Sequence, residues 1–214
     1  MIKAVIFDMD GVLIDTEKHY NAAWCEAAHM AGFDDFGREH ALMLRSCDAR
    51  LASEMMKDIF GAGFDYGAIR EVRRRLVAER LERYGLEKKP GIDEILDFLH
   101  ERQIKTAVAT ATPIALTLQH LGKIGVKDRF DQIVSAKQVA NGKPAPDVYL
   151  YACGQIGEQP ADCIAVEDSP NGIKSAYAAG CRPVMVPDLT PPDEEVGPML
   201  YAVADTLADL KKLF

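Results

Sequence analysis

Two aspartates, Asp8 and Asp10, stand two positions apart in the segment DMDGV of residues 8–12. The apolar run before them, residues 3–7, is typical of a buried strand, so both carboxylates follow the end of that strand. Side chains alternate along extended chain, and residues two apart therefore face the same way. Because an unperturbed aspartate titrates near ~3.9, Asp8 is ionised at neutral pH and can attack phosphorus without a base. A protonated Asp10 can donate to the leaving oxygen and later take a proton from water.

The aspartate pair alone does not establish catalysis, because an Asp-Gly turn capped by another aspartate accounts for the same residues. A second segment, VATAT of residues 108–112, ends another predicted strand with Thr110 and Thr112. A hydroxyl there, together with backbone N–H groups such as that of Ala111, can hold phosphate oxygens. Thr112 precedes a proline and is also typical of a helix N-cap, and the two roles are compatible.

A third segment, GKPAPD of residues 142–147, places Lys143 between a glycine and two prolines. The prolines restrict the backbone, as a positive charge fixed beside carboxylates requires. A lysine taken by itself is more commonly a solvated surface residue. Its assignment as a phosphate-binding residue therefore depends on the other segments.

A fourth segment, VED of residues 166–168, leaves Glu167 and Asp168 at the end of a further apolar strand. If these two carboxylates converge on Asp8 and Asp10, they repel one another unless a hard divalent cation lies among them. Mg²⁺ with oxygen ligands fits such a group best. We therefore predict a magnesium site formed by these four acidic residues.

The elements that must position these side chains alternate between strand and helix. Short apolar runs at 3–7, 106–109, 132–134, 164–166 and 184–186 predict strands, and helical periodicity falls at 92–99, 113–123, 146–156 and 170–179. Such alternation predicts an α/β fold, a Rossmann-like core whose parallel β-sheet is flanked by helices. The carboxyl ends of parallel strands meet at one edge of the sheet, which is where such folds bind ligands.

One segment interrupts the alternation. Residues 16–85 contain helical periodicities and no convincing strand, and the KKPG segment at 88–91 marks the return to the core. We therefore predict a catalytic core of residues 1–15 and 87–214 and an inserted helical cap domain of residues 16–86. The charge run at 71–75, inside the last of these helices, is interpreted as a solvated face.

Composition excludes several classes of protein. The chain has 214 residues, of which 48% are hydrophobic and 27% charged, as expected for one globular core with a modest insertion. A net charge of -8 disfavours broad binding to nucleic acid or to anionic membranes. No stretch approaches the roughly 18 to 20 apolar residues of a membrane span, and the amino terminus lacks the pattern of a secretory signal. We expect a cytoplasmic monomer or weak dimer that acts on a small phosphorylated metabolite.

The five cysteines are odd in number, widely spaced and without a CxxC pair. This pattern argues against a disulfide framework and against a structural zinc site. We expect reduced and mostly buried thiols.

Taken together, the four segments resemble the haloacid dehalogenase superfamily, in the branch that looks like beta-phosphoglucomutase. The motifs that carry the resemblance are FDMDG at 7–11, VATAT at 108–112, KPAPDVYL at 143–150 and VEDSPNGIKSAYAAG at 166–180. The resemblance implies Asp8 as nucleophile, Asp10 as general acid and base, and Thr110 and Lys143 as the residues that hold the phosphoryl group. It also implies that the segment 16–85 is a mobile cap.

The resemblance further implies how Mg²⁺ is bound. The side chains of Asp8 and Asp168 and the backbone carbonyl of Asp10 would hold the ion, with Glu167 at or near it. An acid at the position of Asp10 favours phosphoryl transfer from an oxygen ester, because members of the superfamily that remove halide or cleave phosphonates lack it.

The acceptor of the phosphoryl group depends on the cap, where the sequence departs from the sugar phosphomutases of this branch. Those mutases carry a histidine where this chain has Tyr20, and His19 is the adjacent residue, about 100° away around a helix. They also carry a Gly-x-x-Arg segment, which here reads SCDA at 46–49, with Arg45 and Arg50 at its two ends. We therefore prefer a phosphatase to a mutase.

Four cap residues, His19, Tyr20, Arg45 and Arg50, are candidate substrate contacts. For Tyr20 the apolar stripe that it shares with Trp24 favours a core position, and for the two arginines a surface position is the alternative. A third hypothesis is a binding protein that kept the fold and lost catalysis. Every residue of the proposed catalytic set is present, which argues against it.

Overall fold

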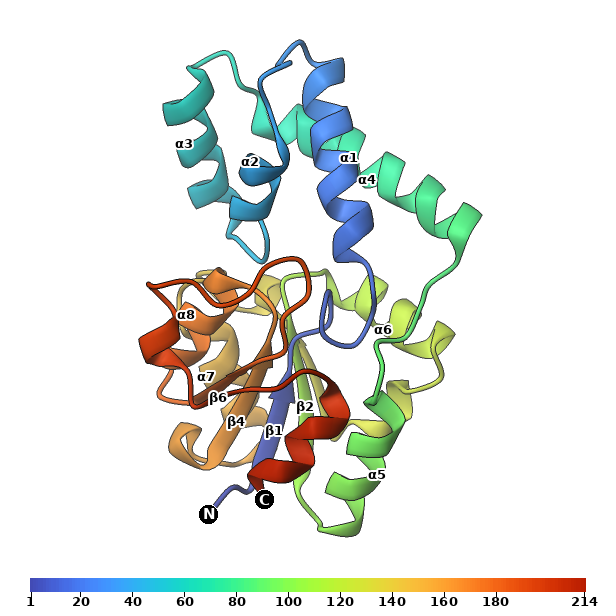
Figure 1. The fold of residues 1–214 in the computed structure, drawn as a ribbon, viewed down its shortest axis with the longest axis vertical. Helices are drawn as coiled ribbons and strands as arrows, with labels where there is room; N and C mark the ends of the chain where they lie inside the picture. Colours follow the sequence, from blue (N-terminus) through green and yellow to red (C-terminus); the bar gives the residue numbers. More distant parts are fainter.

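The computed structural model describes all residues 1–214, as a parallel sheet flanked by helices with four further helices above its upper end (Figure 1). Neighbouring strands in the six-stranded sheet are all parallel, in the order β3-β2-β1-β4-β5-β6. The strands are β1 (Ala4–Phe7), β2 (Lys105–Thr110), β3 (Gln132–Ser135), β4 (Cys163–Glu167), β5 (Arg182–Met185) and β6 (Ala202–Val203). This confirms the predicted Rossmann-like α/β core.

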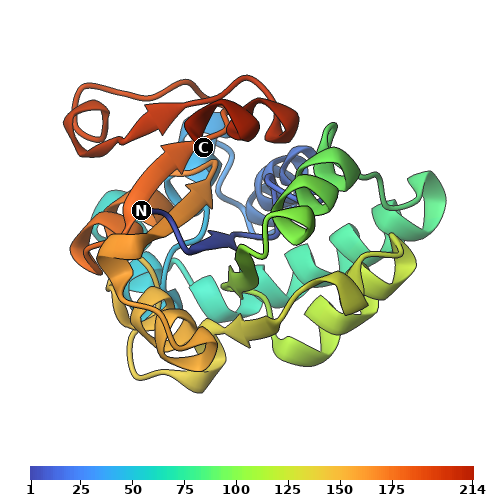
Figure 2. The ribbon, with the colours of Figure 1, turned by 90° about the horizontal axis from the view of Figure 1, so that it is seen from below.

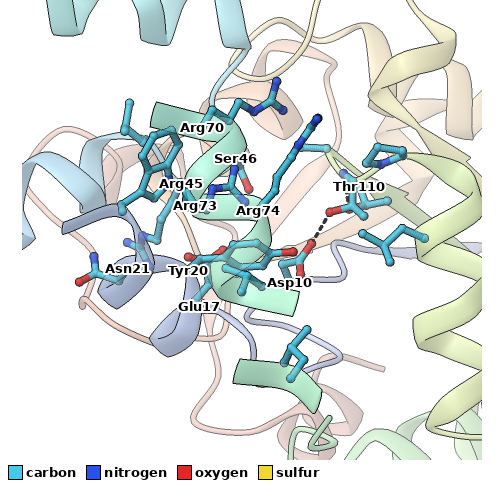
Figure 3. A pocket seen from close by; sticks show the side chains of 18 of the residues that line it. Asp10, Glu17, Tyr20, Asn21, Arg45, Ser46, Arg70, Arg73, Arg74 and Thr110 are labelled. Carbon is cyan, nitrogen blue, oxygen red and sulfur yellow. Dashed lines mark hydrogen bonds between the residues drawn. The ribbon is translucent and has the colours of Figure 1, made fainter. Parts of the chain in front are cut away.

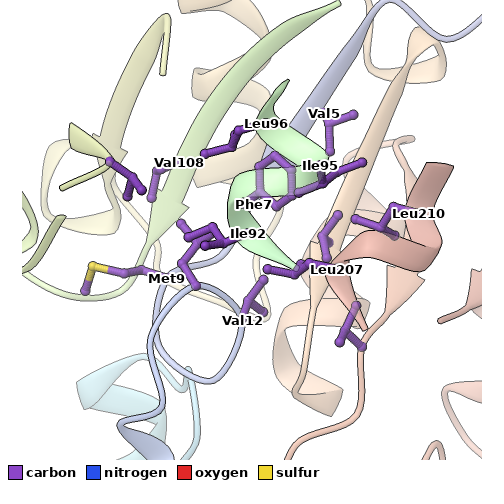
Figure 4. Packing of buried hydrophobic residues seen from close by; sticks show 14 of the residues in the cluster. Val5, Phe7, Met9, Val12, Ile92, Ile95, Leu96, Val108, Leu207 and Leu210 are labelled. Atoms are coloured by element: carbon purple, nitrogen blue, oxygen red, sulfur yellow. The ribbon is translucent and has the colours of Figure 1, made fainter. Parts of the chain in front are cut away.

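Strand β1 lies in the middle of the sheet and is buried on both faces. Val5 and Phe7 point into one hydrophobic cluster, which α5 (Ile92–Glu101), α6 (Ile114–Lys123) and the 3-10 helix η5 (Leu207–Leu213) cover (Figure 4). Ala4 and Ile6 point into the other, which α7 (Asp147–Ile156) and α8 (Pro170–Ala178) cover. Figure 2 shows these two layers of helices on either side of the sheet. Two-sided burial explains why the strand is a continuous apolar run.

The sequence predicted five strands, all of which are present within one or two residues of the expected bounds. The sixth, β6, was missed. It consists of two residues, Ala202 and Val203, of which the first is half-buried and the second exposed. Such a short strand has too few alternating residues to leave a pattern in the sequence.

The segment after β1 forms a helical insertion, defined here as α1 (Glu17–Met30), α2 (Arg38–Met43), α3 (Ala49–Phe60) and α4 (Tyr66–Tyr84). Its helices pack around their own hydrophobic cluster, which includes Trp24, Phe36 and Phe64. No strand interrupts it, as predicted, but the short helix α2 was not predicted. Figure 1 shows the insertion lying over the end of the sheet toward which β1 runs. The division of the chain into two domains at residues 15 and 86 stays a prediction.

Hydrogen bonds join the helical insertion to the first turn of α8 and to the loop that contains Lys143. The Asn171 side chain donates to the carbonyls of Met43 and Arg45, at 3.2 and 2.9 Å. The backbone N–H of Asp48 donates to the carbonyl of Lys143 at 2.8 Å. The segment between α2 and α3 is therefore anchored beside the loops that follow the strands.

All five cysteines are free thiols, as expected, and Cys153, Cys163 and Cys181 are buried in the hydrophobic cluster that α7 and α8 cover. No helix in the structure combines the length and the apolar character needed to cross a membrane.

Candidate active site

The first loop of the core directs both aspartates toward the end of the sheet. Asp8 follows β1 directly, and its backbone N–H donates to the carbonyl of Val166 on β4. Gly11 then turns the chain with a φ of 81°, a conformation that favours glycine. A Cβ at Gly11 would also lie only 2.5 Å from the Asp168 carboxylate. Glycine is therefore required at this position for two reasons: the backbone of the turn has a positive φ, and the carboxylate of Asp168 leaves no room for a Cβ.

Lys143 lies at the centre of the site and is fully buried. Its Nζ contacts a carboxylate oxygen of Asp8 and one of Glu167, both at 2.6 Å, and the carbonyl of Ala109 at 3.1 Å. Burial alone would lower the pKa of Lys143, but Asp8 and Glu167 raise it above its ordinary value. The ammonium is therefore charged and is held between two carboxylates, as the sequence interpretation requires.

Asp8, Glu167 and Asp168 form a buried acidic cluster. One carboxylate oxygen from each lies within 4.8 Å of the others. Burial raises the pKa of Asp8 to about 8, with Lys143 acting in the opposite direction, and burial also raises the pKa of Asp168 well above its ordinary value. The expectation that Asp8 is ionised at neutral pH without help is therefore wrong, because burial favours the neutral acid until further positive charge is added. Without another positive charge, three carboxylates at this spacing repel one another.

One oxygen of the cluster is available to a ligand. Oδ1 of Asp168 is buried and has no hydrogen-bond partner, while Oδ2 of the same residue accepts from Arg45 at 3.2 Å. An unpartnered buried carboxylate oxygen among further carboxylates is the donor set that a hard divalent cation prefers. The residues present therefore fit a Mg²⁺ ion.

Asp10 has different surroundings from Asp8. Its carboxylate accepts hydrogen bonds from the hydroxyls of Thr16 and Thr112, each at 2.7 Å, and it does not contribute to the acidic cluster. Two hydroxyl donors fix its orientation at the pocket. This placement leaves the Asp10 side chain free for proton transfer, the role that the family resemblance implies.

A pocket of about 680 Å³ opens between the core and the helical insertion. Asp8, Asp10, Thr110 and Ala111 line it from the core, at the ends of β1 and β2. Its volume falls within the range typical of small-molecule sites. The predicted catalytic and phosphate-binding residues thus meet at one pocket, with Lys143 buried behind Asp8.

Two of the four candidate cap residues reach this pocket. Tyr20 lines it, although the sequence favoured a core position, and Arg45 lines it while contacting Asp168. Figure 3 shows the Tyr20 side chain beside Asp10 and Arg45 farther from it. The neighbouring Trp24 belongs to the hydrophobic cluster of the insertion and also lines the pocket.

The structure does not bring His19 or Arg50 to the pocket. His19 turns away from Tyr20 around α1 and stacks on Tyr84, with ring centroids 5.9 Å apart. Arg50 lies exposed in the first turn of α3, where its backbone N–H donates to the capping Asp48. The structure therefore does not support His19 or Arg50 as substrate contacts, because neither side chain lines the pocket.

Sequence reasoning missed Tyr149, whose hydroxyl donates to Glu167 at 2.6 Å. Tyr149 is fully buried in α7 and holds the carboxylate that also pairs with Lys143. On an apolar helix a tyrosine is ordinarily a core residue. The only signal available was its position six residues after Lys143, within the same motif.

The interpretation of residues 71–75 as a solvated face is incomplete. Glu71 and Arg75 are exposed, but Arg73 and Arg74 line the pocket, and so does Arg70 one turn earlier. The sequence of a charged helix does not show which of its charged side chains face the pocket. That depends on how α4 packs on the rest of the insertion.

Fold and site together define a Rossmann-like α/β enzyme with a buried aspartate and lysine centre at the carboxyl edge of its sheet. The chain belongs to the haloacid dehalogenase-like hydrolase family, whose sequence profile matches residues 5–186. The resemblance inferred from the four motifs is thereby confirmed.

Relatives within the family include enzymes named as phosphatases. The chain is 31% identical over 191 residues to the phosphorylated carbohydrates phosphatase of Thermotoga maritima, covering 84% of this chain and 82% of that one. It is 30% identical over 190 residues to hexitol phosphatase B of Escherichia coli, covering 87% and 84% of the two chains. The crystal structure of beta-phosphoglucomutase from Clostridium difficile superposes with a TM-score of 0.81 at 25% identity, covering 98% of this chain and 93% of that one.

Proposed function

We propose that this protein is a Mg²⁺-dependent phosphatase that hydrolyses a phosphate monoester of a small metabolite through an aspartyl phosphate on Asp8. The observation that carries the proposal is the arrangement of Asp8, Lys143 and Asp10 at one end of the pocket. Relatives named for phosphorylated carbohydrates and hexitols support a sugar phosphate as substrate.

The chain's own residues account for each step of the reaction. An oxygen of Asp8 attacks phosphorus, and the bond from phosphorus to the ester oxygen breaks as the new bond forms. Asp10 donates its proton to the departing oxygen, which leaves as an alcohol. Asp10 then takes a proton from water as that water attacks phosphorus, releasing phosphate and restoring Asp8. Thr110 and Lys143 hold the phosphoryl oxygens.

The acidic cluster would hold the metal. Side chains of Asp8 and Asp168 and the backbone carbonyl of Asp10 are the proposed ligands, with Glu167 nearby. When bound, Mg²⁺ supplies positive charge that offsets the phosphoryl oxygens and the crowded carboxylates. The helical insertion acts as a cap, which excludes bulk water from the pocket before the reaction begins.

Removal of divalent metal is expected to abolish turnover without unfolding the protein. Dialysis against EDTA should reduce phosphate release to background, and added Mg²⁺ should restore it. Circular dichroism before and after dialysis checks that the protein stays folded. We expect it to stay folded because two large hydrophobic clusters stabilise the core. Full activity in the dialysed protein would contradict a metal-dependent mechanism.

The function is tested by measuring phosphate release from sugar and nucleotide monophosphates in the presence of Mg²⁺. The Asp8→Asn variant is assayed in parallel, so that contaminating phosphatases are recognised. Release that depends on Asp8 supports the proposal, and the preferred ester identifies the metabolite. No release from any ester would overturn it.

The same panel includes conversion of β-glucose 1-phosphate to glucose 6-phosphate, the reaction of a mutase. The fold similarity to beta-phosphoglucomutase makes this the second candidate. The orientation of His19 argues against it, since that side chain stacks on Tyr84 and does not line the pocket. Isomer conversion without net phosphate release would favour the mutase.

Replacing Asp10 with asparagine is expected to slow the reaction most for esters with poor leaving groups. An alkoxide leaving group needs the proton of Asp10, whereas an activated aryl oxide leaves without it. We expect kcat/KM to fall by about 10²–10⁴-fold for alkyl esters and far less for p-nitrophenyl phosphate. An equal loss for both ester types would argue against the role of Asp10 as general acid.

A further inference from the structure

Three arginines of α4, namely Arg70, Arg73 and Arg74, line the pocket and are called here the arginine cluster. Figure 3 shows the three side chains on the same side of the pocket, with Arg73 nearer to Tyr20 and Arg70 farther from Asp10. They belong to the helical insertion, whereas the residues assigned to the reacting phosphoryl group belong to the core. The pocket therefore has two charged regions on different parts of the fold.

Two members of the arginine cluster have no anionic partner. The Nε atoms of Arg70 and Arg73 are buried without a hydrogen-bond partner, and neither guanidinium forms an ion pair. Burial lowers the pKa of Arg73, and the charge of Arg70 acts in the same direction. Arg74 differs from them, because it pairs with Glu71 at 3.1 Å and is half exposed.

Aromatic rings hold Arg73 in place. Its guanidinium carbon lies 4.9 Å from the centroid of the Tyr20 ring and 4.8 Å from that of Trp24. Contacts with the ring faces stabilise a cation, yet they leave the N–H groups at its edge without an acceptor. Arg73 is thereby pre-organised to donate hydrogen bonds into the pocket.

The arrangement is costly in the absence of a ligand. Neighbouring guanidinium groups repel each other, and a buried Nε without an acceptor destabilises the folded state unless an anion contacts the group. Arg45, the other arginine at the pocket, also has an unpartnered Nε, but its two Nη atoms contact Asp168 and Thr190. No carboxylate forms an ion pair with Arg70 or Arg73, whereas Arg45 is paired with Asp168.

We propose that the arginine cluster binds a second anionic group of the substrate, a carboxylate or a further phosphate, at a distance from the phosphoryl group that Asp8 attacks. The inference rests on the proposed function and narrows its substrate class to phosphate monoesters that carry another negative charge. Arginine suits this role because its planar fork of donors matches the oxygens of a carboxylate or phosphate.

Matched pairs of esters test the inference. 6-Phosphogluconate and glucitol 6-phosphate differ only in a terminal carboxylate, and fructose 1,6-bisphosphate differs from fructose 6-phosphate only in a second phosphate. We expect the wild-type enzyme to prefer the more anionic member of at least one pair by about 10-fold or more in kcat/KM. The pair that shows the preference identifies the second anion as carboxylate or phosphate.

The variant Arg70→Gln should lose this preference, because its kcat/KM should fall far more for the more anionic ester of the pair than for the less anionic one. Arg75→Gln is the matched control, because Arg75 is exposed on the same helix and pairs only with Glu79, at 3.9 Å. It should retain the preference. Thermal unfolding of both variants shows whether either substitution has disturbed the fold.

Calorimetry separates failure of this inference from failure of the proposed function. Binding of 6-phosphogluconate, glucitol 6-phosphate and both fructose phosphates is measured with Asp8→Asn, with and without Arg70→Gln. If no ester is hydrolysed, tighter binding of a more anionic ester that depends on Arg70 still supports the arginine cluster as an anion site. Equal affinity within both pairs, or a difference that survives Arg70→Gln, overturns it.

Discussion

Replacing Asp8 with asparagine is expected to lower kcat by about 10⁵-fold or more while the protein stays folded. Asparagine keeps the volume of the side chain but has no anionic oxygen to attack phosphorus. The substitution also removes one partner of Lys143. Glu167 remains 2.6 Å from the same ammonium, so Lys143 is not left as an unpaired buried charge.

Two measurements check this prediction. Phosphate release is compared among the wild type, Asp8→Asn and the control Asp128→Asn, which removes an exposed carboxylate that does not line the pocket. Intact mass of enzyme quenched during turnover should show a phosphoryl adduct in the wild type and none in Asp8→Asn. Activity of Asp8→Asn above a few per cent of the wild type would rule out the aspartyl phosphate.

Replacing Lys143 with methionine is expected to destabilise the protein by about 3–5 kcal/mol and to abolish activity. Methionine fills a similar volume but leaves the carboxylates of Asp8 and Glu167 buried beside each other without the ammonium between them. Removing that charge raises the pKa of Asp8 further, because Lys143 is the group that opposes the effect of burial. A still larger fraction of Asp8 would then be protonated and unable to attack phosphorus.

Urea unfolding gives the change in the free energy of unfolding, and phosphate release gives the change in activity. Lys137→Met serves as the control, since Lys137 is exposed and forms no ion pair. We expect its stability and activity to match those of the wild type. A Lys143→Met variant as stable as the wild type would show that the ammonium does not compensate the two carboxylates.

The core of the site was predictable from the sequence because its chemistry depends on strand ends. Asp8, Thr110 and Glu167 each follow or end a short apolar run, and parallel strands bring such positions to one edge. Local pattern therefore determined both the sheet and the convergence of the four motifs. The family assignment followed from the same motifs and is confirmed.

The sequence was less informative about how each acidic residue is used. Tyr149 supports Glu167 from α7, and two threonine hydroxyls orient Asp10, through contacts between residues up to 102 positions apart. Hydrogen bonds of this kind leave no periodic signal. Only the folded chain shows that Oδ1 of Asp168 is buried without a hydrogen-bond partner.

The sequence by itself determined the order of the elements, the parallel sheet and the residues at its reactive edge, because these depend on short apolar runs and the motifs that end them. Tertiary structure alone decided which side chains of the helical insertion face the pocket. Tyr20 enters it and His19 does not, and Arg73 enters it while Arg75 stays in solvent. The physical reason is that a helix carries polar residues on several faces, and only its packing against the other helices and the core selects the face that meets the substrate.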